Sequence, residues 1–70
     1  MKTIEDSNIT NNDGVRFLNN WKSTNNLADL KFAIQYFEKA IAAARTESEH
    51  TFEIAEKNLK SAKYELAKYV

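Results

Sequence analysis

Apolar residues in the second half of the chain recur at alternating spacings of three and four positions. One such series lies between Leu27 and Ala44, and another lies between Phe52 and Tyr69. This heptad spacing is typical of a helix that packs along one seam against another helix. Paired in reverse order, the residue numbers have a constant sum: Leu27 with Tyr69, Leu30 with Leu66, Ile34 with Ala62, Phe37 with Leu59, Ile41 with Ala55, and Ala44 with Phe52. The pattern therefore predicts an antiparallel helical hairpin.

Capping residues set the expected ends of the two helices. Asn26 can cap a helix over about 27–45, and Ser48 can cap a helix over about 48–69. The alanine-rich stretch of the first helix has strong helix propensity. The chain is therefore expected to reverse near Ser48.

The alternation of large and small residues supports two helices over one. Ala62 opposite Ile34 lets the layers interdigitate without voids. The main rival is one continuous helix, because residues 45–51 contain neither glycine nor proline. However, Ala44 and Phe52 are eight positions apart, which would displace the apolar stripe at mid-helix. The hairpin is the better interpretation.

Charged residues beside the seam favour the same register. The heptad places Glu38 near Lys63 and Arg45 near Glu56, and both pairs are attractive. Exposed pairs of this kind contribute only about 0.2–1 kcal/mol each. They therefore disfavour slipped registers without driving folding.

A third, shorter helix is expected over about 13–23. Its apolar residues share one broad face and are Val15, Phe17, Leu18 and Trp21. Gly14 counts against this helix, and the polar segment 1–12 is expected to be flexible. The predicted architecture is all-α: an antiparallel hairpin plus a short N-terminal helix, in a small three-helix arrangement that forms a single domain over 13–70.

Composition excludes several classes of function. The 70 residues include ten basic and ten acidic side chains, so the formal net charge is zero and no global field attracts nucleic acid or an anionic membrane. The absence of cysteine excludes disulfides and thiolate metal sites. The first residues are too polar for a signal peptide, and no apolar run is long enough to span a bilayer. We therefore expect a cytoplasmic protein without a membrane segment.

No motif points to catalysis, a metal or a cofactor. His50 has Glu53 and Glu56 at helical spacing, but it has no companion nucleophile. One histidine with nearby carboxylates is also a weak metal signal. We expect a non-enzymatic protein, with no cofactor and no metal.

The lysines of the last helix suggest a second functional class. The basic residues Lys57, Lys60, Lys63 and Lys68 surround Tyr64. Such a stripe can bind phosphate, and it makes a dimeric helical-hairpin regulator that binds nucleic acid the alternative function. The acidic first half of the same helix and the neutral chain favour a solvated lysine face instead.

One segment resembles a known repeat family. The run Ala33-Ile34-Gln35-Tyr36-Phe37-Glu38-Lys39-Ala40-Ile41 resembles the second helix of a tetratricopeptide repeat, and Ile54-Ala55 and Tyr64 with Ala67 are similar to part of a following repeat. The preceding segment lacks the family's Trp-Leu-Gly-Tyr pattern, and the chain has no proline to close a repeat. No family is assigned.

The helix over 27–45 has more apolar surface than one partner helix can cover. Its second apolar flank consists of Phe32, Ala33, Tyr36, Ala40 and Ala43. The N-terminal helix can cover this flank, with Trp21 buried near Tyr36 or Ala40. Otherwise the flank binds a partner protein or a second copy of the chain.

These observations predict a protein-protein interaction module. We expect a small inhibitor, adaptor or chaperone-like subunit that binds a larger protein. The candidate contact residues are the aromatic ones outside the heptad seam, namely Phe32, Tyr36, Tyr64, Trp21 and Phe17. Short chains that are rich in asparagine and poor in glycine are frequent in phages and mobile elements, so such an origin is expected by association.

Overall fold

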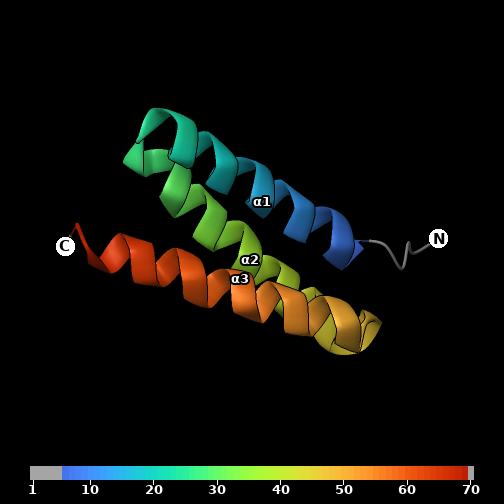
Figure 1. Ribbon diagram of the computed structural model, residues 1–70. Helices are drawn as coiled ribbons and strands as arrows, with labels where there is room; N and C mark the ends of the chain where they lie inside the picture. The colour runs from blue at the N-terminus through green and yellow to red at the C-terminus, as the bar shows by residue number, and fades with distance from the viewer. Residues whose placement is uncertain (1–5, 70) are drawn as a thin grey trace.

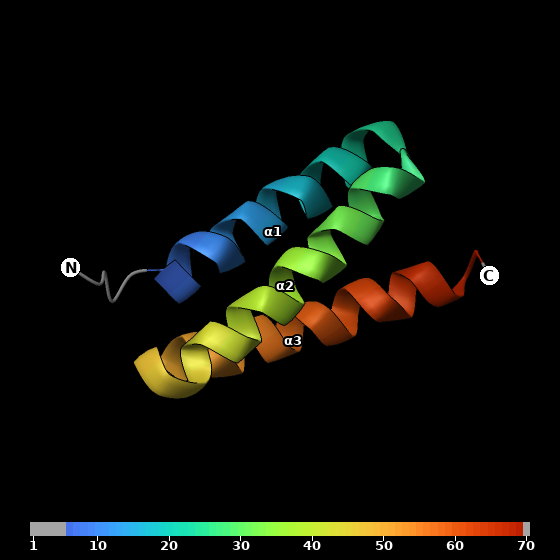
Figure 2. The ribbon, with the colours of Figure 1, turned by 180° about the vertical axis from the view of Figure 1, so that it is seen from behind.

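The computed structural model describes residues 6–69, which form three α-helices: α1 (Asp6–Thr24), α2 (Leu27–Glu47) and α3 (Glu49–Ala67). Figures 1 and 2 show α1 and α3 lying on either side of α2 and running antiparallel to it. The principal extents are 39 × 18 × 14 Å. The predicted all-α class and its three-helix arrangement are confirmed.

Each chain reversal is made by one or two polar residues. Asn25 takes a left-handed conformation, φ 60°, which asparagine tolerates better than most residues. The side-chain oxygen of Asn26 then accepts a hydrogen bond from the Ala28 N–H at 3.0 Å and caps α2. At the second turn Ser48 donates its N–H to the Ala44 carbonyl, while its hydroxyl oxygen accepts from the Thr51 N–H. Ser48 therefore ends α2 and begins α3, at the predicted point of reversal.

The α2–α3 seam contains the residues that the heptad selected. The smaller members of the series, Ala44, Ala55 and Ala62, are buried. Phe37 is fully buried, and Leu59 packs against the same core cluster. These positions place the centre of the core where the hairpin pattern predicted it.

One of the two predicted flanking ion pairs is present. Glu38 Oε2 lies 3.8 Å from Lys63 Nζ. The predicted pairing of Arg45 with Glu56 is wrong, since no ion pair joins them among residues 6–69. The Arg45 guanidinium instead lies 6.0 Å from the centroid of the Phe52 ring, where it gains a cation–π contact.

Helix α1 begins earlier than predicted. Its first residue is Asp6, so the expected start near residue 13 is wrong. The extra turns are anchored by polar contacts: the Ser7 N–H donates to Glu47 Oε1 at 2.9 Å, and Asn58 Nδ2 donates to Asn11 Oδ1 at 3.1 Å. A carboxylate at a helix N-terminus accepts an otherwise unsatisfied N–H and complements the helix dipole. Residues 1–5 of the predicted flexible segment lie outside the described residues.

The α1–α2 seam is formed on α1 partly by small and polar residues, and these face buried residues of α2. Its members have a constant sum of residue numbers: Ser7 with Ala44, Asn11 with Ala40, Gly14 with Phe37, Leu18 with Ala33, and Trp21 with Leu30. A Cβ atom on Gly14 would lie only 2.5 Å from Cε1 of the Phe37 ring. Gly14 therefore lets α1 cross directly over the centre of the core, and α1 and α2 share the most extensive contact of the bundle.

Candidate functional site

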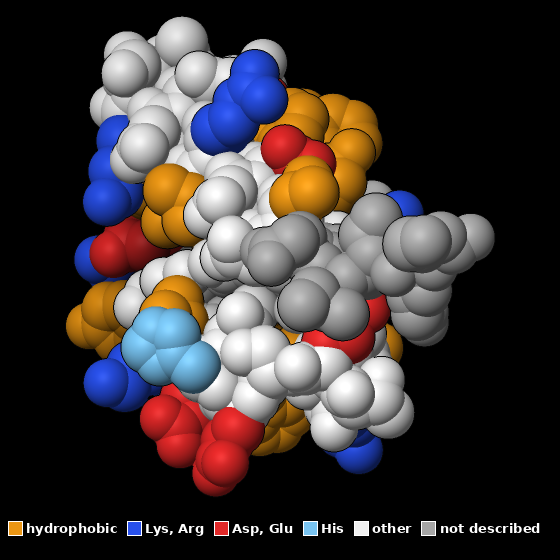
Figure 3. Space-filling model, turned by 90° about the vertical axis from the view of Figure 1, so that its right-hand side faces the viewer, with side chains coloured by type: hydrophobic (Ala, Val, Ile, Leu, Met, Phe, Trp, Pro, Cys, Tyr) orange, Lys and Arg blue, Asp and Glu red, His pale blue; other side chains and the backbone are white. Residues whose placement is uncertain are grey.

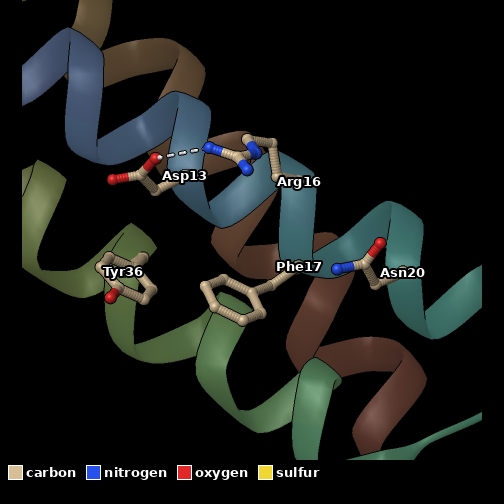
Figure 4. A pocket seen from close by; sticks show the side chains of 5 residues that line it. All are labelled: Asp13, Arg16, Phe17, Asn20 and Tyr36. Carbon is tan, nitrogen blue, oxygen red and sulfur yellow. Dashed lines mark ion pairs between the residues drawn. The ribbon is translucent and has the colours of Figure 1, made fainter.

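Three aromatic side chains meet on the outer side of the groove between α1 and α2. Phe17 of α1 lies between Phe32 and Tyr36 of α2, with ring centroids 5.4 Å and 5.3 Å apart, respectively. Phe17 is stacked on Tyr36 at an interplanar angle of 10° and is tilted by 45° to Phe32. We call these three residues the aromatic patch. Figure 4 shows the Phe17 and Tyr36 rings together between the two helices.

The register of the α1–α2 seam produces the aromatic patch. Phe32 and Tyr36 are one helical turn apart and so present adjacent rings on α2. The seam places Phe17 level with the space between them, where one ring contacts both. Helix α1 therefore covers the flank only in part, because Phe17 and Tyr36 are half-buried while Phe32 remains 46% exposed.

A shallow pocket of about 220 Å³ adjoins the aromatic patch. It is lined by Asp13, Arg16, Phe17, Asn20 and Tyr36 (Figure 4). Asp13 Oδ1 lies 3.7 Å from Arg16 Nη1, and these side chains are 38% and 82% exposed, respectively. The pocket thus combines an aromatic wall with a carboxylate, an amide and a solvent-exposed guanidinium.

The rim of the aromatic patch carries charges of both signs. Lys39 Nζ lies 5.5 Å from the centroid of the Tyr36 ring, within cation–π range. Arg16 adds a second positive charge, and Asp13 adds a negative one. The aromatic patch therefore has an apolar centre and a charged, solvated rim.

Trp21 lies in the core and not on this surface. The prediction that it is at least half buried is confirmed, since only 7% of the residue is exposed. Its core neighbours include Leu30, and its ring meets Tyr69 edge-on at 6.5 Å. It does not lie beside Tyr36, which stacks on Phe17 instead. The reason is geometric: the chain reverses just after Trp21, which therefore faces the first turns of α2.

Tyr64 lies apart from the aromatic patch on α3. It is 68% exposed, and Lys68 Nζ is 4.9 Å from its ring centroid. The same ammonium pairs with Glu65 at 3.2 Å. Tyr64 is therefore a single exposed ring with a neutralised lysine, and the structure does not bring it together with the other four candidate residues.

A second hollow, which the sequence did not indicate, lies beside the α2–α3 turn. It has a volume of about 410 Å³ and is lined by Ala44, Arg45, Glu49 and Phe52. The end view in Figure 3 shows the only histidine, His50, at the surface with acidic side chains beside it. This hollow holds the Arg45 guanidinium over the Phe52 ring, together with the Glu49 carboxylate.

The described residues offer no other site of the types considered. Within residues 6–69, no group of three His, Cys, Asp or Glu side chains is placed to hold a metal ion. No helix in this part of the chain combines the length and apolar character that crossing a bilayer requires. Comparison of the chain with protein-family models, curated proteins and solved structures finds no match.

Proposed function

We propose that this protein is a non-enzymatic interaction module that binds a larger protein through the aromatic patch. The observation that supports the proposal best is the partial exposure of Phe32, which remains 46% exposed although Phe17 packs against it. Exposed aromatic rings grouped within an apolar surface are a recurrent feature of binding sites.

The geometry of the aromatic patch suits binding at low entropic cost. Phe17 and Tyr36 hold each other in place by stacking, so neither ring must be ordered when a partner arrives. Phe32 is the most exposed of the three rings and would serve as the anchor for a pocket on the partner. Aromatic anchors of this kind supply large contact area with few rotatable bonds.

The proposed role is that of a small inhibitor, adaptor or chaperone-like subunit acting in the cytoplasm. The neutral net charge favours a protein partner over nucleic acid, because phosphate binding depends on cationic contacts that release counterions. Origin from a phage or mobile element stays a prediction by association.

The test compares two aromatic substitutions on different helices. Phe32→Ser removes the exposed anchor, and Tyr64→Ser removes an exposed ring on α3 as the matched control. Each tagged variant captures proteins from a lysate of the source cells, and mass spectrometry quantifies what is recovered. We expect Phe32→Ser to lose the specific partner while its helicity, by circular dichroism, is unchanged.

Two outcomes would contradict the proposal. Undiminished capture by Phe32→Ser, with loss on Tyr64→Ser, would move the binding surface to α3. A complex with RNA or DNA that weakens steeply with added salt would favour the nucleic-acid regulator instead.

A further inference from the structure

The pocket beside the aromatic patch has the chemistry to hold an arginine side chain. Its wall is formed by Phe17 and Tyr36, and its polar groups are the Asp13 carboxylate and the Asn20 amide. A guanidinium is planar, stacks on aromatic rings and pairs with a carboxylate through two N–H donors. These four side chains provide both kinds of contact.

An arginine that is free to enter such a pocket lies on the same face of the protein. Arg16 is 82% exposed and stands at the rim of the pocket. Its internal partner Asp13 is 3.7 Å away, which is too long for a strong hydrogen bond. An exposed pair three residues apart on a helix contributes little, so exchanging it for a better pair costs little.

We infer that two copies of this chain associate through this face, with Arg16 of each copy seated against Asp13 of the other. A pocket and its matching ligand on one surface are self-complementary, which is the condition for a two-fold symmetric dimer.

The size and charge of the molecule are compatible with this dimer. Its accessible surface is 4857 Å², so the roughly 800 Å² that each partner buries in a standard interface is about a sixth of it. The zero net charge means that two copies do not repel each other at long range. The inference uses the surface of the proposed function, but it does not depend on a larger partner.

A charge exchange tests the inference directly. In the proposed dimer, position 13 of each copy faces position 16 of the other. A dimer of the Asp13→Arg variant therefore brings two positive side chains together at each contact, and a dimer of the Arg16→Asp variant brings two negative ones together. Each variant alone is expected to dimerise roughly tenfold or more weakly than the unmodified chain. In an equimolar mixture each new arginine meets an aspartate of the other variant, so a mixed dimer should form. Sedimentation velocity and native mass spectrometry measure the species present.

The control uses an ion pair of the same spacing on another helix. Glu65 and Lys68 of α3 are exposed and lie 3.2 Å apart, and Glu65→Lys and Lys68→Glu should leave dimerisation unchanged. Circular dichroism of every variant checks that the helices persist. A chain that stays monomeric at millimolar concentration, single variants that dimerise normally, or a mixture that fails to pair would each overturn the inference. None of these results bears on capture of a larger protein through Phe32, which the preceding experiment measures separately.

Discussion

The two sides of α2 are built by different means. Toward α3, α2 presents large branched residues such as Ile34 and Ile41, which are only partly buried. Toward α1 it presents Ala33 and Ala40, which are completely buried. The side with smaller residues is therefore the more thoroughly enclosed.

The difference shows that close packing of two helix backbones can replace bulky side chains in a small core. Helix α1 contributes Gly14 and the polar residues Ser7 and Asn11 to its seam, all of which are buried. Small side chains bring helix axes close together, so backbone and short side chains fill the space that leucine fills elsewhere. The Ser7 backbone N–H then donates to Glu47, and Asn11 Oδ1 accepts from Asn58 Nδ2 of α3, so that both bonds anchor the start of α1.

The largest expected effect comes from Phe37, the bulkiest of the residues that belong to both seams. Phe37→Ala leaves a cavity under both α1 and α3 and should cost about 3–5 kcal/mol, enough to unfold most molecules of this size. Chemical denaturation can be followed by the emission of Trp21, which should be blue-shifted in the folded chain. Phe32→Ala is the control on the same helix and should cost much less. A small loss at Phe37 would show that the seams do not meet there.

Gly14→Ala tests whether close approach holds the α1–α2 seam together. The added Cβ would lie 2.5 Å from the fully buried Phe37 ring, and overpacking of this kind costs about 1–3 kcal/mol. The higher helix propensity of alanine offsets up to about 1 kcal/mol of this cost, so the expected net loss is at most about 2 kcal/mol. Asn19→Ala, at an exposed position of α1, should not destabilise. A more stable Gly14→Ala protein would contradict the contact, and Phe37→Leu should relieve the loss if the contact is real.

Glu47→Ala tests the polar anchor at the start of α1. The substitution removes the acceptor of the Ser7 N–H and should cost about 0.5–1 kcal/mol, comparable with loss of a helix cap. Thermal unfolding measures the change, and Glu56→Ala, at an exposed position in the middle of α3, is the matched control. Equal melting temperatures for the two variants would remove Glu47 from the account of why α1 begins at Asp6.

The smallest expected effect comes from the Glu38–Lys63 ion pair, which tests the register of the α2–α3 seam. Glu38 and Lys63 are both more than half exposed, so their pair should contribute only about 0.2–1 kcal/mol. A double-mutant cycle with Glu38→Ala and Lys63→Ala isolates this interaction. A coupling that disappears in high salt fits the observed register, whereas repulsion between the two sites would require a different one.

The hairpin could be predicted from the sequence because its core positions are apolar and periodic. The start of α1 could not be predicted in the same way, because Ser7 and Asn11 are polar residues at core positions. A signal was nevertheless present. Ser7, Asn11, Gly14, Leu18 and Trp21 have heptad spacing and pair with α2 at a constant sum of residue numbers. A search for apolar periodicity does not detect such a seam, because its serine and asparagine are polar and because glycine and asparagine have low helix propensity.

Only the part of the aromatic patch that lies on a single helix could be predicted from the sequence. Phe32 and Tyr36 form a continuous pair by their spacing alone. The place of Phe17 between them depends on the α1–α2 register, which the periodicity of apolar residues does not determine because that seam contains polar residues. Trp21 was misplaced for the same reason. Arg45 lies over the Phe52 ring and forms no ion pair with Glu56, because heptad geometry places the backbone of a residue but does not determine its side-chain conformation.

Ser48 has a consequence for how this protein can change during evolution. A single residue ends α2 and begins α3, so the connection has no spare length. Inserting or deleting one residue there would rotate α3 by about 100° relative to its predecessor and turn its apolar stripe away from α2. Related sequences are therefore expected to keep the length of this junction fixed, and the two-residue turn between α1 and α2 is constrained in the same way.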